Sequence, residues 1–184
     1  ILGGITVLTN LSPVTVAAHM LLSLVTIAAS TVLYLRTKER VTGVYAVAVG
    51  TQRLRPLVMA LAADAALILV LGTIVTGSGP HSGDADQPAR FGFDLQTVSR
   101  VHALSVWALV ALSVLLWRQL RGGQWPVALK RLRQLVMLIT VQAVVGYVQY
   151  ALQLPWQMVL VHMLLAALFA VSVTALLDSL HPRE

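Results

Sequence analysis

The stretch QAVVGYVQYALQLPWQMVLVHMLL, residues 142–165, contains the end of one apolar segment, a short turn with a proline, and the start of another apolar segment. A similar stretch, GGITVLTNLSPVTVAAHMLL, occupies residues 3–22. An offset of 143 aligns Gly3 with Gly146 and places the same His-Met-Leu-Leu run in both copies. Each copy predicts a hairpin of two membrane helices with a histidine one to two turns into the second. A repeat of this length indicates two related halves.

The composition of the 184-residue chain is typical of a membrane protein. Hydrophobic residues make up 58% of it, charged residues 11%, and the mean hydropathy is +0.82. Since about 20 apolar residues cross a bilayer as a helix, the sequence predicts five spans, at 14–35, 57–76, 98–117, 134–152 and 157–177. These spans leave no room for a large soluble domain, and short alternating strands are absent. We therefore predict an all-α transmembrane bundle of five spans preceded by a helix stub.

Positive charges cluster in two alternate loops. Ten of the 13 basic residues are Arg36, Lys38, Arg40, Arg53 and Arg55 in the first loop and Arg118, Arg121, Lys130, Arg131 and Arg133 in the second. The positive-inside rule then predicts a multi-pass protein of the cell membrane, with loops 36–55 and 118–133 and the C-terminus in the cytoplasm. We interpret the net charge of +6 as a topology signal and expect no nucleic-acid partner.

Three histidines share one depth in this topology. His19, His102 and His162 lie four to six residues past the outer starts of three parallel spans, which places them roughly 6–9 Å inside the outer boundary. An intramembrane histidine can hydrogen-bond to another helix, relay protons or bind a metal. Two histidines on facing helices can supply both axial ligands of a haem iron, and His102 with His162 is the expected pair. With no carboxylate or thiol beside them, zinc and di-iron centres are disfavoured.

Two other charged residues lie in or near the spans. Arg100 is positioned either to hold a haem propionate or to extend to lipid headgroups. Asp64 is the only acidic residue deep in a span; we expect a structural hydrogen bond to Gln142 or another helix, with a proton path as the alternative.

Further polar residues lie on one helix and in the outer loops. Gln142 and Gln149, seven residues apart, share one helix face that we expect to point inward. We expect His81 and His181, in a loop and in the tail, to be solvated.

Several motifs together resemble the haem A synthase family, in its actinobacterial form, over essentially the whole chain. They are GGITVLT at 3–9 followed by His19, Gly72-Thr73, GPHSGD at 79–84, RVHA at 100–103, QAVVGYVQY at 142–150, and His162-Met163.

The resemblance implies an eight-helix enzyme of two pseudosymmetric four-helix halves. It implies oxidation of the C8 methyl group of haem O to a formyl group, which makes haem A for cytochrome oxidase. His102 and His162 would bind the iron of a haem b that relays electrons, and His19 would bind the substrate haem iron. Residues 1–36 would end the N-terminal half, 37–55 would form a cytoplasmic loop, and 56–184 would form the C-terminal half.

The resemblance also implies a chain truncated at its N-terminus. The family's catalytic carboxylate and second substrate-site histidine are expected before residue 1, so we assign no catalytic residue here. Expected partners are haem O, the lipid bilayer, a haem O synthase and an electron acceptor; homo-oligomerisation stays open. One alternative is a diheme b-type cytochrome that only transfers electrons. A transporter or assembly factor is disfavoured, because the spans contain no interior proline.

Overall fold

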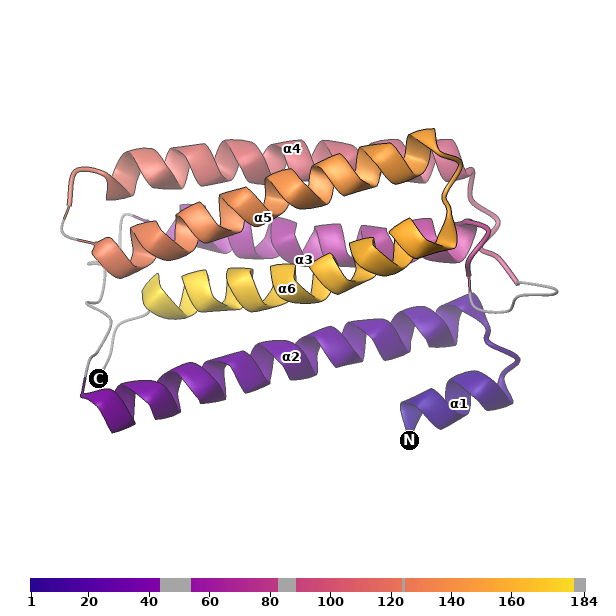
Figure 1. Ribbon diagram of the computed structural model, residues 1–184, viewed down its shortest axis with the longest axis horizontal. Coiled ribbons are helices and arrows are strands. Elements are labelled where there is room, and N and C mark those ends of the chain that lie inside the picture. Colours follow the sequence, from indigo (N-terminus) through magenta and orange to yellow (C-terminus); the bar gives the residue numbers. More distant parts are fainter. Residues whose placement is uncertain (44–53, 83–88, 124, 181–184) are drawn as a thin grey trace.

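The computed structural model describes residues 1–43, 54–82, 89–123 and 125–180, and these are almost entirely helical. The six helices are α1 Leu2–Leu8, α2 Pro13–Thr42, α3 Arg55–Ser78, α4 Leu95–Leu120, α5 Pro126–Ala151 and α6 Trp156–Leu180 (Figure 1). Helices α2 to α6 are long and apolar enough to cross a membrane. The prediction of an all-α protein with five spans and a preceding stub is therefore confirmed.

The five long helices exceed the apolar runs that predict them. Helix α2 continues to Thr42, so it covers the start of the predicted 37–55 loop, and α5 begins at Pro126, eight residues before the predicted span 134–152. Hydropathy marks the part of a helix that lies in lipid, whereas prolines and capping groups set where the helix begins and ends. Proline occupies the first turn of α2, α3 and α5, and α2 ends at Gly43, whose φ of 66° is left-handed.

Asp94 fixes the start of α4. Its carboxylate accepts hydrogen bonds from the Thr97 hydroxyl at 2.7 Å and from the Thr97 backbone N–H at 2.8 Å. These bonds hold the pKa of Asp94 below its usual range. The carboxylate therefore stays charged at a helix N-terminus, where the helix dipole favours negative charge.

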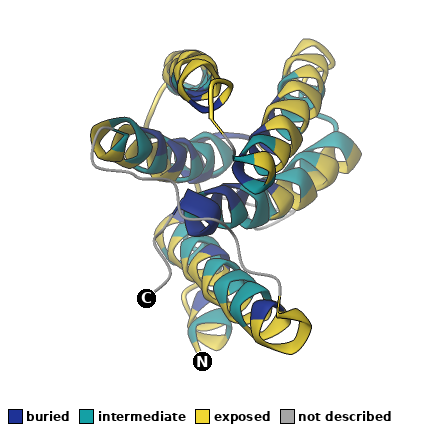
Figure 2. Ribbon diagram, turned by 90° about the vertical axis from the view of Figure 1, so that its left-hand side faces the viewer, coloured by how far each residue is buried: buried dark blue, intermediate teal, exposed yellow. Residues whose placement is uncertain are grey.

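Helices α3 to α6 form a four-helix bundle, with α2 and α1 to one side (Figures 1 and 2). Helix α3 packs against α4 and α6, and α5 packs against α4 and α6. Helices α4 and α6 make no backbone contact in the described part of the chain. They are therefore one diagonal pair of the bundle, and α3 and α5 are the other. Helix α2 packs on α6 and α3, while α1 contacts α2 alone among the described helices.

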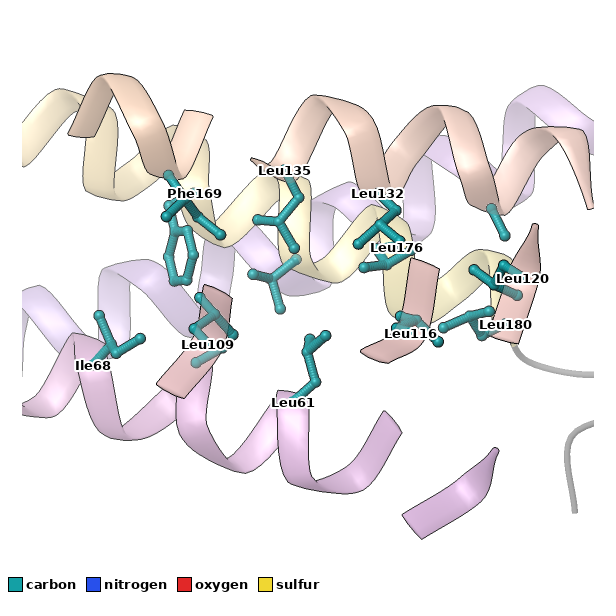
Figure 3. Packing of buried hydrophobic residues seen from close by; sticks show 14 residues of the cluster. Leu61, Ile68, Leu109, Leu116, Leu120, Leu132, Leu135, Phe169, Leu176 and Leu180 are labelled. Carbon is teal, nitrogen blue, oxygen red and sulfur yellow. The ribbon is translucent and has the colours of Figure 1, made fainter. Parts of the chain in front are cut away.

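The bundle is densely packed at one end only. We call the end with Thr42, Leu54, Leu120, Pro126 and Leu180 the cationic end, and the end with Pro13, Ser78, Leu95, Ala151 and Trp156 the histidine end. The buried apolar cluster fills the side toward the cationic end (Figure 3), with Leu61, Ala65, Ile68, Leu109, Leu116, Leu120, Ala128, Leu132, Leu135, Ile139, Phe169, Val173, Leu176 and Leu180. By contrast, no residue from 140 to 168 is buried. Helices α5 and α6 therefore contribute no buried side chain at the histidine end.

The two hairpins related by the 143-residue offset share one turn geometry. The Leu154 N–H donates to the Gln149 carbonyl at 2.7 Å, and in the first copy the Leu11 N–H donates to the Thr6 carbonyl at 2.9 Å. This hydrogen bond belongs to a Schellman helix ending, which requires left-handed backbone. The φ values are 62° and 61° at Gln153 and Leu154, and 52° and 53° at the two equivalent residues of the first copy. The repeat therefore extends from sequence to backbone conformation.

At the cationic end, a buried carboxylate joins three helices. The Asp178 side chain on α6 is only 2% exposed, and its oxygens lie 2.9 Å from Nε of Arg36 on α2 and 3.6 Å from Nη1 of Arg131 on α5. Arg131 also donates to the carbonyl of Ala175. Since α2 lies outside the four-helix bundle, Asp178 holds it to the bundle electrostatically.

Replacing Asp178 by Asn is expected to lower the free energy of unfolding in detergent by about 3 kcal/mol, because two guanidinium groups lose a buried partner. Arg36→Gln is expected to cost about 1 kcal/mol, because the Arg36 side chain is 42% exposed. Thermal unfolding of the two variants measures the difference. Equal losses would contradict the buried role of Asp178.

Gln153→Gly is expected to stabilise the protein by about 1 kcal/mol, because glycine adopts left-handed backbone without the cost borne by other residues. Asn10→Gly, at the equivalent position, should gain less, because asparagine tolerates this conformation better than glutamine does. Thermal unfolding in detergent compares them. A loss of stability in Gln153→Gly would show that its left-handed conformation is not strained.

Candidate functional site

His102 and His162 lie at the histidine end on the diagonal helices α4 and α6. His102 is seven residues into α4 and His162 is six residues into α6, and both side chains are half-buried. Among the described residues, Nδ1 of each ring is buried and has no hydrogen-bond partner. A pair of half-buried histidines on diagonal helices is a candidate ligand set for one metal.

Each of the three intramembrane histidines lies against a glycine on the preceding helix. A methyl group on Gly146 would lie 3.1 Å from Cε1 of His162, and one on Gly72 would lie 3.6 Å from Cε1 of His102. At His19, the ring lies against Gly3 of α1, with a corresponding distance of 3.3 Å. The missing side chain lets each ring lie directly against a neighbouring helix. The Gly-x15-His spacing of the repeat therefore corresponds to a physical contact.

Gln142 and Gln149 line the interior next to His162, as their shared helix face predicts. The Gln142 side-chain amide donates to the His162 carbonyl at 3.1 Å, which ties α5 to α6 just below the ligand. The side-chain carbonyl oxygens of both glutamines are buried without a hydrogen-bond partner. The predicted bond between Gln142 and Asp64 is not formed, because their helices α5 and α3 make no contact in the described part of the chain. Oδ2 of Asp64 is buried and has no partner.

Each candidate ligand is positioned by the other helix of its own hairpin. The His102 ring lies against Gly72 on α3, and the His162 ring lies against Gly146 on α5.

Arg100 and His19 are both exposed. Arg100 lies five residues after the start of α4, near the histidine end. A role of Arg100 at a propionate stays a prediction. His19 lies on α2, outside the four-helix bundle but beside α6, at the same end as His162.

His81 is exposed, as predicted, and also makes a contact that the sequence did not predict. Although exposed, its ring Nε2 lies 2.7 Å from the carbonyl oxygen of Leu154, so the loop after α3 is joined to the turn between α5 and α6. The Ser82 hydroxyl, in the same loop, donates to the Ala89 carbonyl at 2.6 Å. His181 lies outside the described residues.

Two histidines suit a metal that is already coordinated by a cofactor and needs few protein ligands. Among the described residues, no group of three or more His, Cys, Asp or Glu side chains converges. A haem iron takes four nitrogens from the porphyrin and needs two axial ligands from the protein, and a histidine pair is one such set. Half-buried histidines on the diagonal helices, with no buried residue from 140 to 168 on α5 and α6, fit a haem between α4 and α6.

Comparison of the chain with protein-family models, with curated protein sequences and with solved structures found no match.

Gly146→Ala is expected to weaken haem binding about fivefold or more, because the added methyl group pushes the His162 ring and overpacking of this kind costs roughly 1–3 kcal/mol. Gly72→Ala should have nearly the haem affinity of the parent protein, because its added methyl group lies at an ordinary contact distance from His102. Titration of the haem-free protein with haem, followed by absorbance, gives both affinities. Gly4→Ala, with no atom within 4 Å of the added group, is the matched control. Equal haem affinities for Gly146→Ala and Gly72→Ala would contradict this geometry.

Proposed function

We propose that the chain belongs to a haem A synthase, in which His102 and His162 bind the iron of a haem b. One observation carries the proposal: the diagonal helices α4 and α6 each carry a half-buried histidine at the same end, and each ring lies against a glycine of the preceding helix. The resemblance of the surrounding motifs to the haem A synthase family supplies the reaction. The proposal assigns the cell membrane as its location and the cytoplasm to the cationic end.

The chain's own residues would hold and orient the cofactor. Gly72 and Gly146 let the two rings approach their helices closely, and Gln142 fixes the backbone at His162. Arg100, near the start of α4, would bind a propionate through its guanidinium group. Bound haem b supplies one-electron redox chemistry, which the protein tunes through its ligands and their burial.

The second haem site is proposed at His19. Conversion of the haem O methyl group and one water molecule to a formyl group releases four electrons and four protons. His19 would hold the substrate haem iron on α2, which packs against α6 and carries its histidine at the same end. Neighbouring sites at that end suit electron transfer from the substrate to haem b. The acceptor that takes these electrons onward is a further expected partner, as is a haem O synthase that supplies the substrate.

Haem extraction from the full-length protein, expressed with and without a haem O source, tests the function. Haem b in both preparations, with haem O and haem A only when the source is present, is expected. Haem b alone in both would instead indicate a b-type cytochrome that transfers electrons without oxidising haem O.

His102→Ala and His162→Ala are each expected to abolish the absorbance of haem b, because one axial ligand is lost from a site that has two. His19→Ala should keep that absorbance and lose conversion of haem O. Spectra of purified variants with unchanged helical circular dichroism measure the first effect. Loss of haem b in His19→Ala, or its retention in both other variants, would refute the division into two sites.

A further inference from the structure

A groove runs between α4 and α5 near the cationic end, well away from the histidines. Its volume is about 400 Å³. The lining residues are Val114 and Trp117 from α4 and Leu132, Arg133, Val136 and Met137 from α5. Leu132 is buried and forms the floor, whereas the other four apolar residues are each more than 40% exposed. The groove is therefore an open, mainly apolar depression on the lipid-facing surface.

One charged side chain lies in this otherwise apolar lining. Arg133 is followed on the same face of α5 by Val136 and Met137, three and four residues on. Side chains on a helix tilt toward its N-terminus, so Arg133 extends toward the cationic end. Long basic side chains at this depth reach the headgroup region in the same way.

Two of the neighbouring cations are already engaged, but Arg133, which lines the groove, is not. Arg131 pairs with Asp178, and the Arg121 guanidinium lies 5.1 Å from the Trp117 ring centre. Within the described residues, Arg133 forms no ion pair. A cation beside an apolar groove, with no acidic side chain paired to it, complements a ligand that has an anionic head and a hydrocarbon tail.

We propose that this groove binds one anionic phospholipid, with its phosphate at Arg133 and an acyl chain along Val114, Val136 and Met137. Basic pockets between membrane helices recognise anionic headgroups in this way. The site is separate from the proposed haem sites and does not depend on them. Its ligand comes from the bilayer leaflet that faces the cationic end.

Trp117 lines the groove and serves as the probe. A variant with Trp107→Phe, Trp125→Phe and Trp156→Phe leaves it as the sole tryptophan. The full chain is reconstituted in vesicles that contain brominated phosphatidylglycerol or brominated phosphatidylcholine, and quenching of Trp117 fluorescence gives the relative affinity of the two lipids. About fivefold preference for phosphatidylglycerol is expected from one basic contact.

Arg133→Gln should remove that preference, while Arg118→Gln should keep it. Arg118 is exposed and adjacent to Trp117 but does not line the groove, so it is matched in charge and location. Val136→Phe keeps every charge and fills the groove, and it should also remove the preference. The proposal fails if Arg133→Gln retains the preference, if Arg118→Gln loses as much, or if Val136→Phe has no effect. Unchanged helical circular dichroism and unchanged quenching by phosphatidylcholine in Arg133→Gln show that the variant is folded.

Discussion

A neutral imidazole placed inside an apolar bundle needs a partner for its ring nitrogens, and much of this structure is arranged around that requirement. Water is excluded from such a position and apolar side chains offer no hydrogen bonds, so an unpaired nitrogen costs free energy. The chain places two imidazoles on diagonal helices, with no buried apolar side chain from 140 to 168. The stability of the fold then depends on the opposite half, where the leucine-rich core and the Asp178 pairs hold the helices together.

Much of this arrangement was predictable from sequence because it follows from periodicity. Apolar run lengths gave the five spans, and the spacing of Gln142 and Gln149 gave their common face. The 143-residue offset predicted two related hairpins, and the structure shows the same left-handed turn in both. Depth along each span likewise placed the histidines at one end, since rise per residue is nearly constant in helices.

Contacts between helices were not predictable, because they depend on which helices are neighbours and how each is rotated. Asp178 lies where a span ends and looks like an interfacial residue, yet its partners are Arg36 and Arg131, 142 and 47 residues away. The predicted Asp64–Gln142 bond failed for the same reason. The Gly-x15-His repeat could have predicted the contacts of His19 with Gly3 and of His162 with Gly146. The Gly72–His102 contact has no such signal in the sequence.

The way in which each imidazole is held has a consequence for assembly. His162 is positioned by Gly146 and Gln142 within one hairpin, and His102 by Gly72 within the other. Each half of the site is thus formed within a single hairpin. The leucine-rich core at the cationic end joins the two hairpins. A haem bound between the two hairpins would complete the packing of the bundle at the histidine end. The cofactor would therefore be part of the hydrophobic core as well as the redox group.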